Sequence, residues 1–196
     1  IEGFNNNQTV FEEVQVISVS TDSIEFDKNK SKIIDLIQKY IPYHVFLCVY
    51  SSKEFVINIC EKRINLNDSN RRTIEKSLVT ENILINNETD IQKTFLKDLS
   101  FENIDKHDLK SLYDSFSKSI VALQASNING EFINRPIEQS KQDLERLERI
   151  KKLENEILQL QNQAKKESQL NTQVKINSEV QFRRKEIELI KEKLKK

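Results

Sequence analysis

The chain has 196 residues, of which 37 % are hydrophobic and 32 % charged, so it is more polar than an average globular protein. Lysine plus arginine number 31, as do aspartate plus glutamate, and the formal net charge is +0. This balance disfavours a nonspecific nucleic-acid binder, which normally carries a basic surplus. No apolar run approaches the roughly 18 residues of a membrane span, and no signal peptide is recognisable, so we expect a cytoplasmic protein.

The polar residues are distributed unevenly. Up to Leu123 the chain has ordinary apolar clusters, whereas beyond Pro136 it consists mostly of Glu, Lys, Gln, Asn, Leu and Ile. We therefore predict an α+β domain over 1–125, a linker over 126–137 and a coiled-coil tail over 138–196. The sequence contains no methionine, so we expect that the native N-terminal segment is missing.

The first predicted elements are a strand and a helix. Residues 10–20 (VFEEVQVISVS) combine alternation with β-branched residues, which is typical of a strand. Asp27 is a candidate N-cap for a helix that runs to about Tyr40. Pro42 ends this helix because the residue before a proline disfavours the α region.

A pair of strands follows. Residues 43–50 (YHVFLCVY) form an almost continuous apolar run, which predicts a central strand buried on both faces. Residues 53–61 return as its antiparallel partner, and 78–85 form a weaker strand candidate. The predicted fold class is α+β, a small mixed or antiparallel sheet with helices on one face, followed by a C-terminal helical hairpin or coiled coil.

The two cysteines lie on this predicted strand pair. A tight turn near Ser52 would place Cys48 opposite about Phe55, so Cys48 and Cys60 are not opposite each other and a disulfide is disfavoured. We expect two buried thiols of a reducing compartment.

An amphipathic helix is predicted over 105–124. Its apolar residues recur at steps of three and four, and they are Leu109, Leu112, Phe116, Ile120 and Leu123. Residues 127–136 contain Gly130 and Pro136, which indicates a linker.

The tail carries a hydrophobic seam at heptad spacing. Its first half is Leu147, Ile150, Leu153, Ile157, Leu160 and Ala164, and its second half is Ile176, Val180, Arg183, Ile187, Ile190 and Leu194. One continuous helix of about 58 residues would reach about 85 Å and would need a second chain to cover its seam. The seam fades midway, which favours a hairpin that turns near 168–172. An arginine on the seam is expected to snorkel or to pair with a carboxylate.

Few residues suggest chemistry. Gly3 and Gly130 are the only glycines, which excludes a P-loop and a dinucleotide-binding fingerprint. His44 and His107 do not have zinc-ligand spacing, and we interpret His44 as a structural histidine at a strand end. We predict no catalytic residue, no metal and no cofactor. Glu13 and Glu61 come nearest to the carboxylates of a metal-dependent nuclease, but each lacks part of the necessary set.

Two basic clusters are candidate contacts to nucleic acid, and they consist of Arg71 and Arg72, and of Arg183, Arg184 and Lys185. Acidic residues accompany both clusters. A solvated charged face is therefore the favoured interpretation, and phosphate binding is the alternative.

Several segments resemble a bacterial family catalogued as domain of unknown function 4391. They are VQVISVS (14–20), IPYHVFLCVY (41–50), DLKSLYDSFSKSIV (108–121) and LERLERIKKLENEI (144–157). The resemblance extends from about 14 to 194. It implies a further N-terminal segment and genes often placed beside helicase and DNA-methyltransferase genes in restriction-like or anti-phage loci. The resemblance does not identify an active-site residue in this chain.

The leading hypothesis is a non-catalytic accessory subunit of a bacterial DNA-targeting complex that acts through its C-terminal helices. The partner would be a helicase, a DNA methyltransferase or a second copy of the chain. The residues expected to bury against partner or sister helices are Leu147, Leu153, Ile157, Leu160, Ile176, Val180, Ile187 and Ile190. The alternatives are a metal-dependent nuclease-like subunit and a nucleic-acid-binding adaptor.

Overall fold

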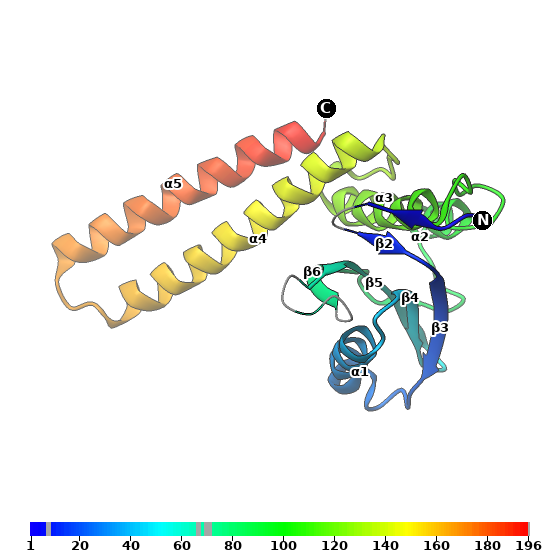
Figure 1. Cartoon of the computed structure of the whole chain (residues 1–196). Coiled ribbons are helices and arrows are strands. Elements are labelled where there is room, and N and C mark those ends of the chain that lie inside the picture. Colours follow the sequence, from blue (N-terminus) through cyan, green and yellow to red (C-terminus); the bar gives the residue numbers. More distant parts are fainter. Residues whose placement is uncertain (7–8, 66–67, 69–71, 196) are drawn as a thin grey trace.

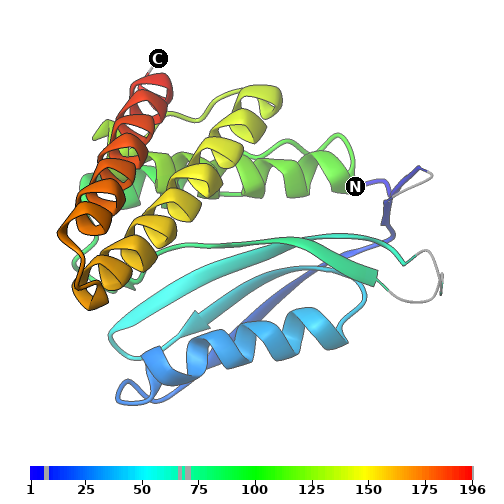
Figure 2. The same cartoon turned by 90° about the vertical axis from the view of Figure 1, so that its left-hand side faces the viewer.

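The computed structural model describes the chain except for residues 7–8, 66–67, 69–71 and 196. A mixed sheet lies between helices, and a hairpin of two long helices extends from one helical layer (Figure 1, Figure 2). The predicted α+β class is confirmed.

The main sheet has the strand order β3-β4-β5-β6, and β7 pairs with β5. Its strands are β3 (Val14–Ser20), β4 (His44–Tyr50), β5 (Glu54–Ile64), β6 (Arg72–Val79) and β7 (Ile83–Leu84). β3 and β4 are parallel, and the other pairs are antiparallel. A parallel pair needs a crossover connection, and α1 (Phe26–Tyr40) provides it.

The strand predicted over 10–20 is divided into two. Among the described residues, β2 (Val10–Phe11) pairs with β1 (Phe4–Asn5) in a small separate sheet, and β3 begins after Glu12 and Glu13. The exposed carboxylates of these two residues favour a break over a continuous strand.

The start of α1 differs from the prediction and its end agrees with it. Glu25 occupies the N-cap position, and Asp27 lies within the first turn, where Lys30 Nζ donates to its Oδ1 over 2.6 Å. The helix starts earlier because Phe26, which belongs to its first turn, is completely buried. The predicted cap at Asp27 is therefore wrong, although a carboxylate in the first turn still favours the helix electrostatically. The helix ends at Tyr40, before Pro42.

β4 is the central strand that the apolar run predicts. It lies between β3 and β5, and Val45, Leu47 and Val49 are completely buried beneath α1. The predicted register of β4 and β5 is wrong by two residues, because Tyr50 and not Cys48 lies opposite Phe55. The turn is short, and Ser51 N donates to Glu54 O over 2.8 Å to close it.

Both cysteines are free thiols. Cys48 is half-buried and lies opposite Ile57, while Cys60 is buried. Burial raises the pKa of both thiols, so they are protonated and behave as packing groups.

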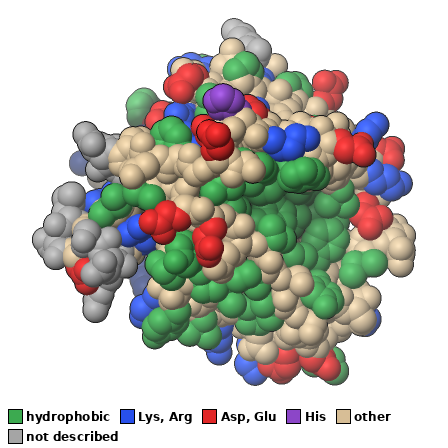
Figure 3. Space-filling view, turned by 45° about the vertical axis from the view of Figure 1, so that its right-hand side comes forward, with side chains coloured by type: hydrophobic (Ala, Val, Ile, Leu, Met, Phe, Trp, Pro, Cys, Tyr) green, Lys and Arg blue, Asp and Glu red, His purple; other side chains and the backbone are tan. Residues whose placement is uncertain are grey.

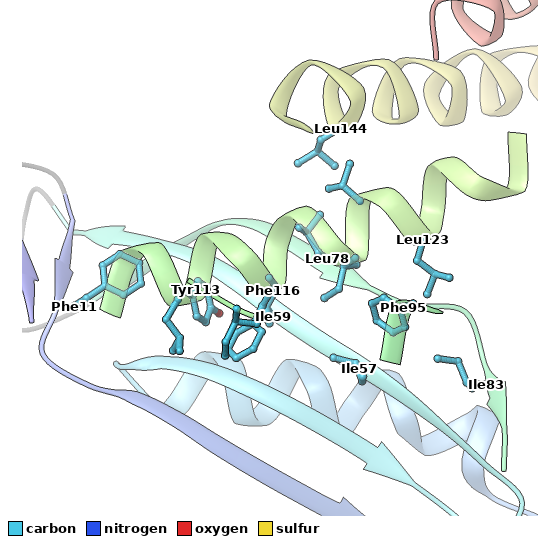
Figure 4. Packing of buried hydrophobic residues seen from close by; sticks show 14 residues of the cluster. Phe11, Ile57, Ile59, Leu78, Ile83, Phe95, Tyr113, Phe116, Leu123 and Leu144 are labelled. Carbon is cyan, nitrogen blue, oxygen red and sulfur yellow. The ribbon is translucent and has the colours of Figure 1, made fainter. Parts of the chain in front are cut away.

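Helices cover both faces of the sheet, so the predicted placement on one face is wrong. α1 packs on one face, while α2 (Asp90–Asp98) and α3 (Leu109–Asn129) pack on the other (Figure 2). Figure 4 shows Tyr113 and Phe116 of α3 beside Ile57 and Ile59 of β5. Apolar side chains point from β4 and β5 to both sides, and each side must be removed from water.

The ends of α3 follow recognisable caps. Asp108 accepts from Ser111 N over 2.7 Å at the start, and Gly130 ends the helix with a φ of 78°. A residue with positive φ after a helix is usually glycine. The helix thus continues to Asn129, into the segment predicted as linker.

The C-terminal part is a helical hairpin formed by α4 (Ile137–Lys166) and α5 (Leu170–Leu194) (Figure 1). Leu144 of α4 belongs to the same hydrophobic cluster as Tyr113, so the first turns of the hairpin share the core of the sheet layer. The division of the chain at 125 and 138 stays a prediction. No helix among the described residues has the length and apolarity to cross a membrane.

Candidate protein-interaction surface

The seam of the hairpin is filled by the chain itself. Ile150 and Leu153 of α4 cluster with Ile187 and Leu194 of α5, and Ile128 of α3 packs against them. All eight predicted seam residues are buried or half-buried, namely Leu147, Leu153, Ile157, Leu160, Ile176, Val180, Ile187 and Ile190. A partner must therefore use another face while the hairpin stays closed.

Ion pairs join the two arms at the edges of the seam. Arg149 Nη2 lies 2.7 Å from Glu186 Oε1, and Arg183 Nε lies 2.8 Å from Glu156 Oε2. The hydrogen bond between Arg183 and Glu156 lowers the pKa of Glu156 and raises that of Arg183. The seam arginine thus pairs with a carboxylate, and the carboxylate belongs to the same chain. Such exposed pairs orient the arms more than they stabilise them.

The root of the hairpin is held by a buried carboxylate and two arginines. Asp143 is 4 % exposed and lies 3.2 Å from Arg135 Nη1 and 2.8 Å from Arg146 Nη1. Arg135 Nη2 also donates to Leu194 O over 2.8 Å. The last carbonyls of a helix have no partner within the helix, so this contact caps α5 and attaches it to the start of α4.

The outer face of α5 carries a second apolar stripe. Val174, Phe182 and Leu189 are 57 %, 68 % and 67 % exposed, and their spacing of eight and seven residues places them on one side of the helix. This outer stripe lies opposite Ile176, Val180 and Ile187, which face α4. Single exposed apolar residues are common, but an aligned set on a helix that already buries another stripe indicates a contact surface.

The main cluster of buried polar groups lies between β4 and β5. The backbones of the two strands pair over Leu47–Tyr50. Between the part of β4 before Leu47 and the facing part of β5, side chains make the hydrogen bonds instead. The Tyr113 hydroxyl lies 3.0 Å from Cys60 N, whose N–H it accepts, and 3.1 Å from Val45 O. Gln38 Nε2 reaches Asn58 Oδ1 over 2.8 Å from the α1 side.

Lys62 and His44 complete this buried cluster. Lys62 Nζ donates to Ile41 O and Tyr43 O, each over 2.8 Å, and burial lowers its pKa to about 8. His44 stacks on Phe11 with ring centroids 3.7 Å apart. Burial, and then the charge of Lys62, lowers the pKa of His44 to about 4. His44 is 2 % exposed, so it packs the strand end.

This shift predicts acid sensitivity. The unfolded chain takes up a proton at His44 near pH 6.5, whereas the folded chain does so only near pH 4. Between these values acid favours the unfolded state, and we expect His44 to account for a loss of about 3 kcal/mol of stability as the pH falls from 6.5 to below 4.

Urea unfolding at a series of pH values measures this loss. The control is His44→Phe, which keeps an aromatic ring against Phe11 and removes the titration. The difference in unfolding free energy between the two proteins should change over pH 6.5–4. An equal pH dependence in both proteins would contradict the assignment.

The residues suggested for nucleic-acid contact lie on different elements. Arg72 begins β6, while Arg184 and Lys185 are exposed on α5. Arg183 is occupied by Glu156, as described above. Arg71 lies outside the described residues.

The two carboxylates of the nuclease alternative also lie on different segments. Glu13 precedes β3 and accepts from Gln15 Nε2. Glu61 lies on β5, with β4 between the two strands, and burial raises its pKa. Within the described part of the chain, no group of three or more His, Cys, Asp or Glu residues could hold a metal ion.

Fold and surface together define an α+β protein with a projecting helical hairpin. A family model described as Domain of unknown function (DUF4391) matches residues 1–187, and the chain belongs to this family. No curated protein and no solved structure matches the chain.

Proposed function

We propose that this chain is a non-catalytic assembly subunit and that the outer stripe of α5 docks a helix of a partner protein. The observation that carries the proposal is the second apolar face of α5. One stripe on each helix suffices to close a two-helix hairpin, so Val174, Phe182 and Leu189 do not serve the packing of the chain itself. An amphipathic partner helix can cover such a stripe with its own apolar face.

The charges beside the outer stripe support a protein partner. Two basic residues, Arg184 and Lys185, and two acidic residues, Glu188 and Glu192, lie around Leu189. A nucleic acid presents uniform negative charge and favours a basic surface, whereas a surface with both signs suits a helix that also carries both. The outer stripe therefore fits a protein better than a phosphate backbone.

The cellular setting is part of the proposal. The family resemblance implies a bacterial DNA-targeting complex of the restriction-like or anti-phage kind, in which a helicase or DNA methyltransferase would be the partner. Both cysteines are free thiols, which agrees with a protein that works in the reducing cytoplasm.

The test is the double variant Phe182→Asp with Leu189→Asp. Both side chains are exposed, so we expect the helical content and the melting temperature to stay unchanged while partner affinity falls by about tenfold or more. The control is Asn155→Asp with Gln159→Asp, which adds the same charge at exposed polar positions of the other arm, α4.

Tagged wild-type and variant chains are purified from the source cells, and associated proteins are quantified by mass spectrometry. A helicase or methyltransferase that is retained by the wild type and the control and lost from the outer-stripe variant supports the proposal. Equal retention by all three proteins would remove the outer stripe as the docking face. A wild-type chain that retains neither enzyme would remove the DNA-targeting setting.

A further inference from the structure

β3 has an open hydrogen-bonding edge. Among the described residues it pairs with β4 on one side, and no strand pairs with its other side. Its sequence, VQVISVS, contains no charged residue and no proline. An exposed edge of this kind is a ready template for another strand, and soluble monomers usually protect it with charges, prolines or bulges.

The opposite edge of the same sheet is protected. β6 carries Arg72, Glu75 and Lys76, and a register irregularity lies between Glu61 and Lys62 of the adjoining strand. Lys76 Nζ also lies 3.5 Å from Glu148 Oε1 of α4, so the hairpin lies alongside this edge. The contrast between the two edges indicates that β3 is covered in the working state of the protein.

Apolar side chains flank the open edge on both faces of the sheet. Val16 is 74 % exposed, and its pairing with Phe46, which contacts Phe116, places it on the α3 face. Figure 3 brings forward the side of the molecule on which β3 lies in Figure 1, and hydrophobic side chains line a hollow there.

The second flank belongs to α1. Ile33 and Ile37 pack in the same cluster as Ile17 of β3, and the exposed Leu36 and Tyr40 follow them by three residues each on the same side of the helix. Gln38, on the other side of the helix, reaches Asn58 of β5. Leu36 and Tyr40 therefore lie on the flank of α1 nearer to β3.

We propose that two copies of the chain form a dimer through antiparallel pairing of their β3 strands about a two-fold axis. A two-fold axis places two copies of the same strand antiparallel to each other. The free N–H and C=O groups on the open edge of each copy can then hydrogen-bond with those of the other copy. The two sheets then become continuous, and the α1 helices lie side by side beneath them, where Leu36 and Tyr40 meet their counterparts.

Charge favours a second copy as the occupant. The formal net charge is +0, so two copies do not repel each other as whole molecules, and β3 brings no like charges together.

The test is the mass of the full chain in solution, measured by light scattering over a range of concentrations. The wild type should approach twice the chain mass of 23.1 kDa. Val16→Lys should raise the dimer dissociation constant by about tenfold or more, because a lysine on an edge strand opposes pairing. Ser18→Lys, also on an exposed position of β3, should act in the same way.

The matched control is Ile74→Lys, which places the same charge at a half-exposed position of β6 and should leave the mass unchanged. Hydrogen exchange gives a second measurement, since the amides of β3 that point away from β4 should exchange slowly in the wild type and quickly in Val16→Lys. An unchanged helical circular dichroism signal and a cooperative thermal transition show that all variants fold.

The other outcomes overturn the proposal. They are a wild type that stays at the monomer mass, a dimer that tolerates Val16→Lys and Ser18→Lys, and a dimer that Ile74→Lys dissociates equally. A dimer lost only in Phe182→Asp with Leu189→Asp would place self-association on the outer stripe of α5. Partner docking on α5 and pairing of β3 therefore succeed or fail separately.

Discussion

Replacing Tyr113 by phenylalanine is expected to lower the free energy of unfolding by about 2–5 kcal/mol, since buried groups left without a partner cost about 1–3 kcal/mol each. The Tyr113 hydroxyl accepts from Cys60 N and lies within 3.1 Å of the carbonyl oxygens of Val45 and Cys60. Burial raises the pKa of Tyr113, so the hydroxyl keeps its proton. Phenylalanine would keep the ring against Phe116 and leave Cys60 N–H unpaired.

Chemical denaturation of Tyr113→Phe and of a matched control measures this effect. The control is Tyr50→Phe, which removes the same hydroxyl from a ring that is 39 % exposed on β4 and should change stability by less than about 0.5 kcal/mol. Equal stability of the two variants would show that the β4–β5 junction does not depend on the hydroxyl of α3.

Truncating Leu153 to alanine is expected to cost about 2–5 kcal/mol and to loosen the hairpin. Leu153 is 1 % exposed at the centre of the cluster that joins α4 to α5 and to Ile128 of α3. The loss combines the transfer of the apolar side chain with the cavity that remains between three helices. Thermal unfolding followed by the helical circular dichroism signal measures it.

Leu158→Ala serves as the control for this prediction. Leu158 lies on the same helix five residues away and is 56 % exposed, so its truncation should cost less than about 0.5 kcal/mol. If the two alanine variants had the same melting temperature, the packing of the two arms of the hairpin would not depend on this seam.

The closed seam changes how partner binding must be tested. The seam spacing would suggest aspartate at Ile157 and Leu160 as a test of assembly. However, Ile157 packs in the cluster that joins α4 to α5, and Leu160 is also half-buried. That variant would open the hairpin and remove any surface that depends on it. Aspartate at Phe182 and Leu189 leaves the seam intact and separates folding from binding.

The spacing of the outer stripe is visible in the sequence, but the sequence does not show that this stripe is exposed. Val174, Phe182 and Leu189 recur at helical spacing, and the heptad pattern directs attention to a single seam on each helix. Exposure decides which of two apolar stripes is free, and exposure depends on where the partner arm lies. The sequence does not indicate the buried polar cluster around Lys62, because a lysine in a strand normally lies on a solvated face.

Some features of this protein follow from interactions between neighbouring residues. Pro42 ends α1, and Gly130 ends α3 through its positive φ. The apolar run of 43–50 specifies a strand that must be covered on both sides. The capping box of Thr89 and Gln92 marks the start of α2 and could have been read from the spacing of the two residues.

Other features depend on contacts between residues far apart in the chain. The register of β4 and β5, the helices on both faces and the pairing of Arg183 with Glu156 are of this kind, as is the contrast between the edges β3 and β6. Periodicity shows that a face is apolar, but it does not identify what covers that face. Only the packed chain distinguishes the seam that it fills from the edge and the stripe that it leaves open, because burial is a property of the whole fold.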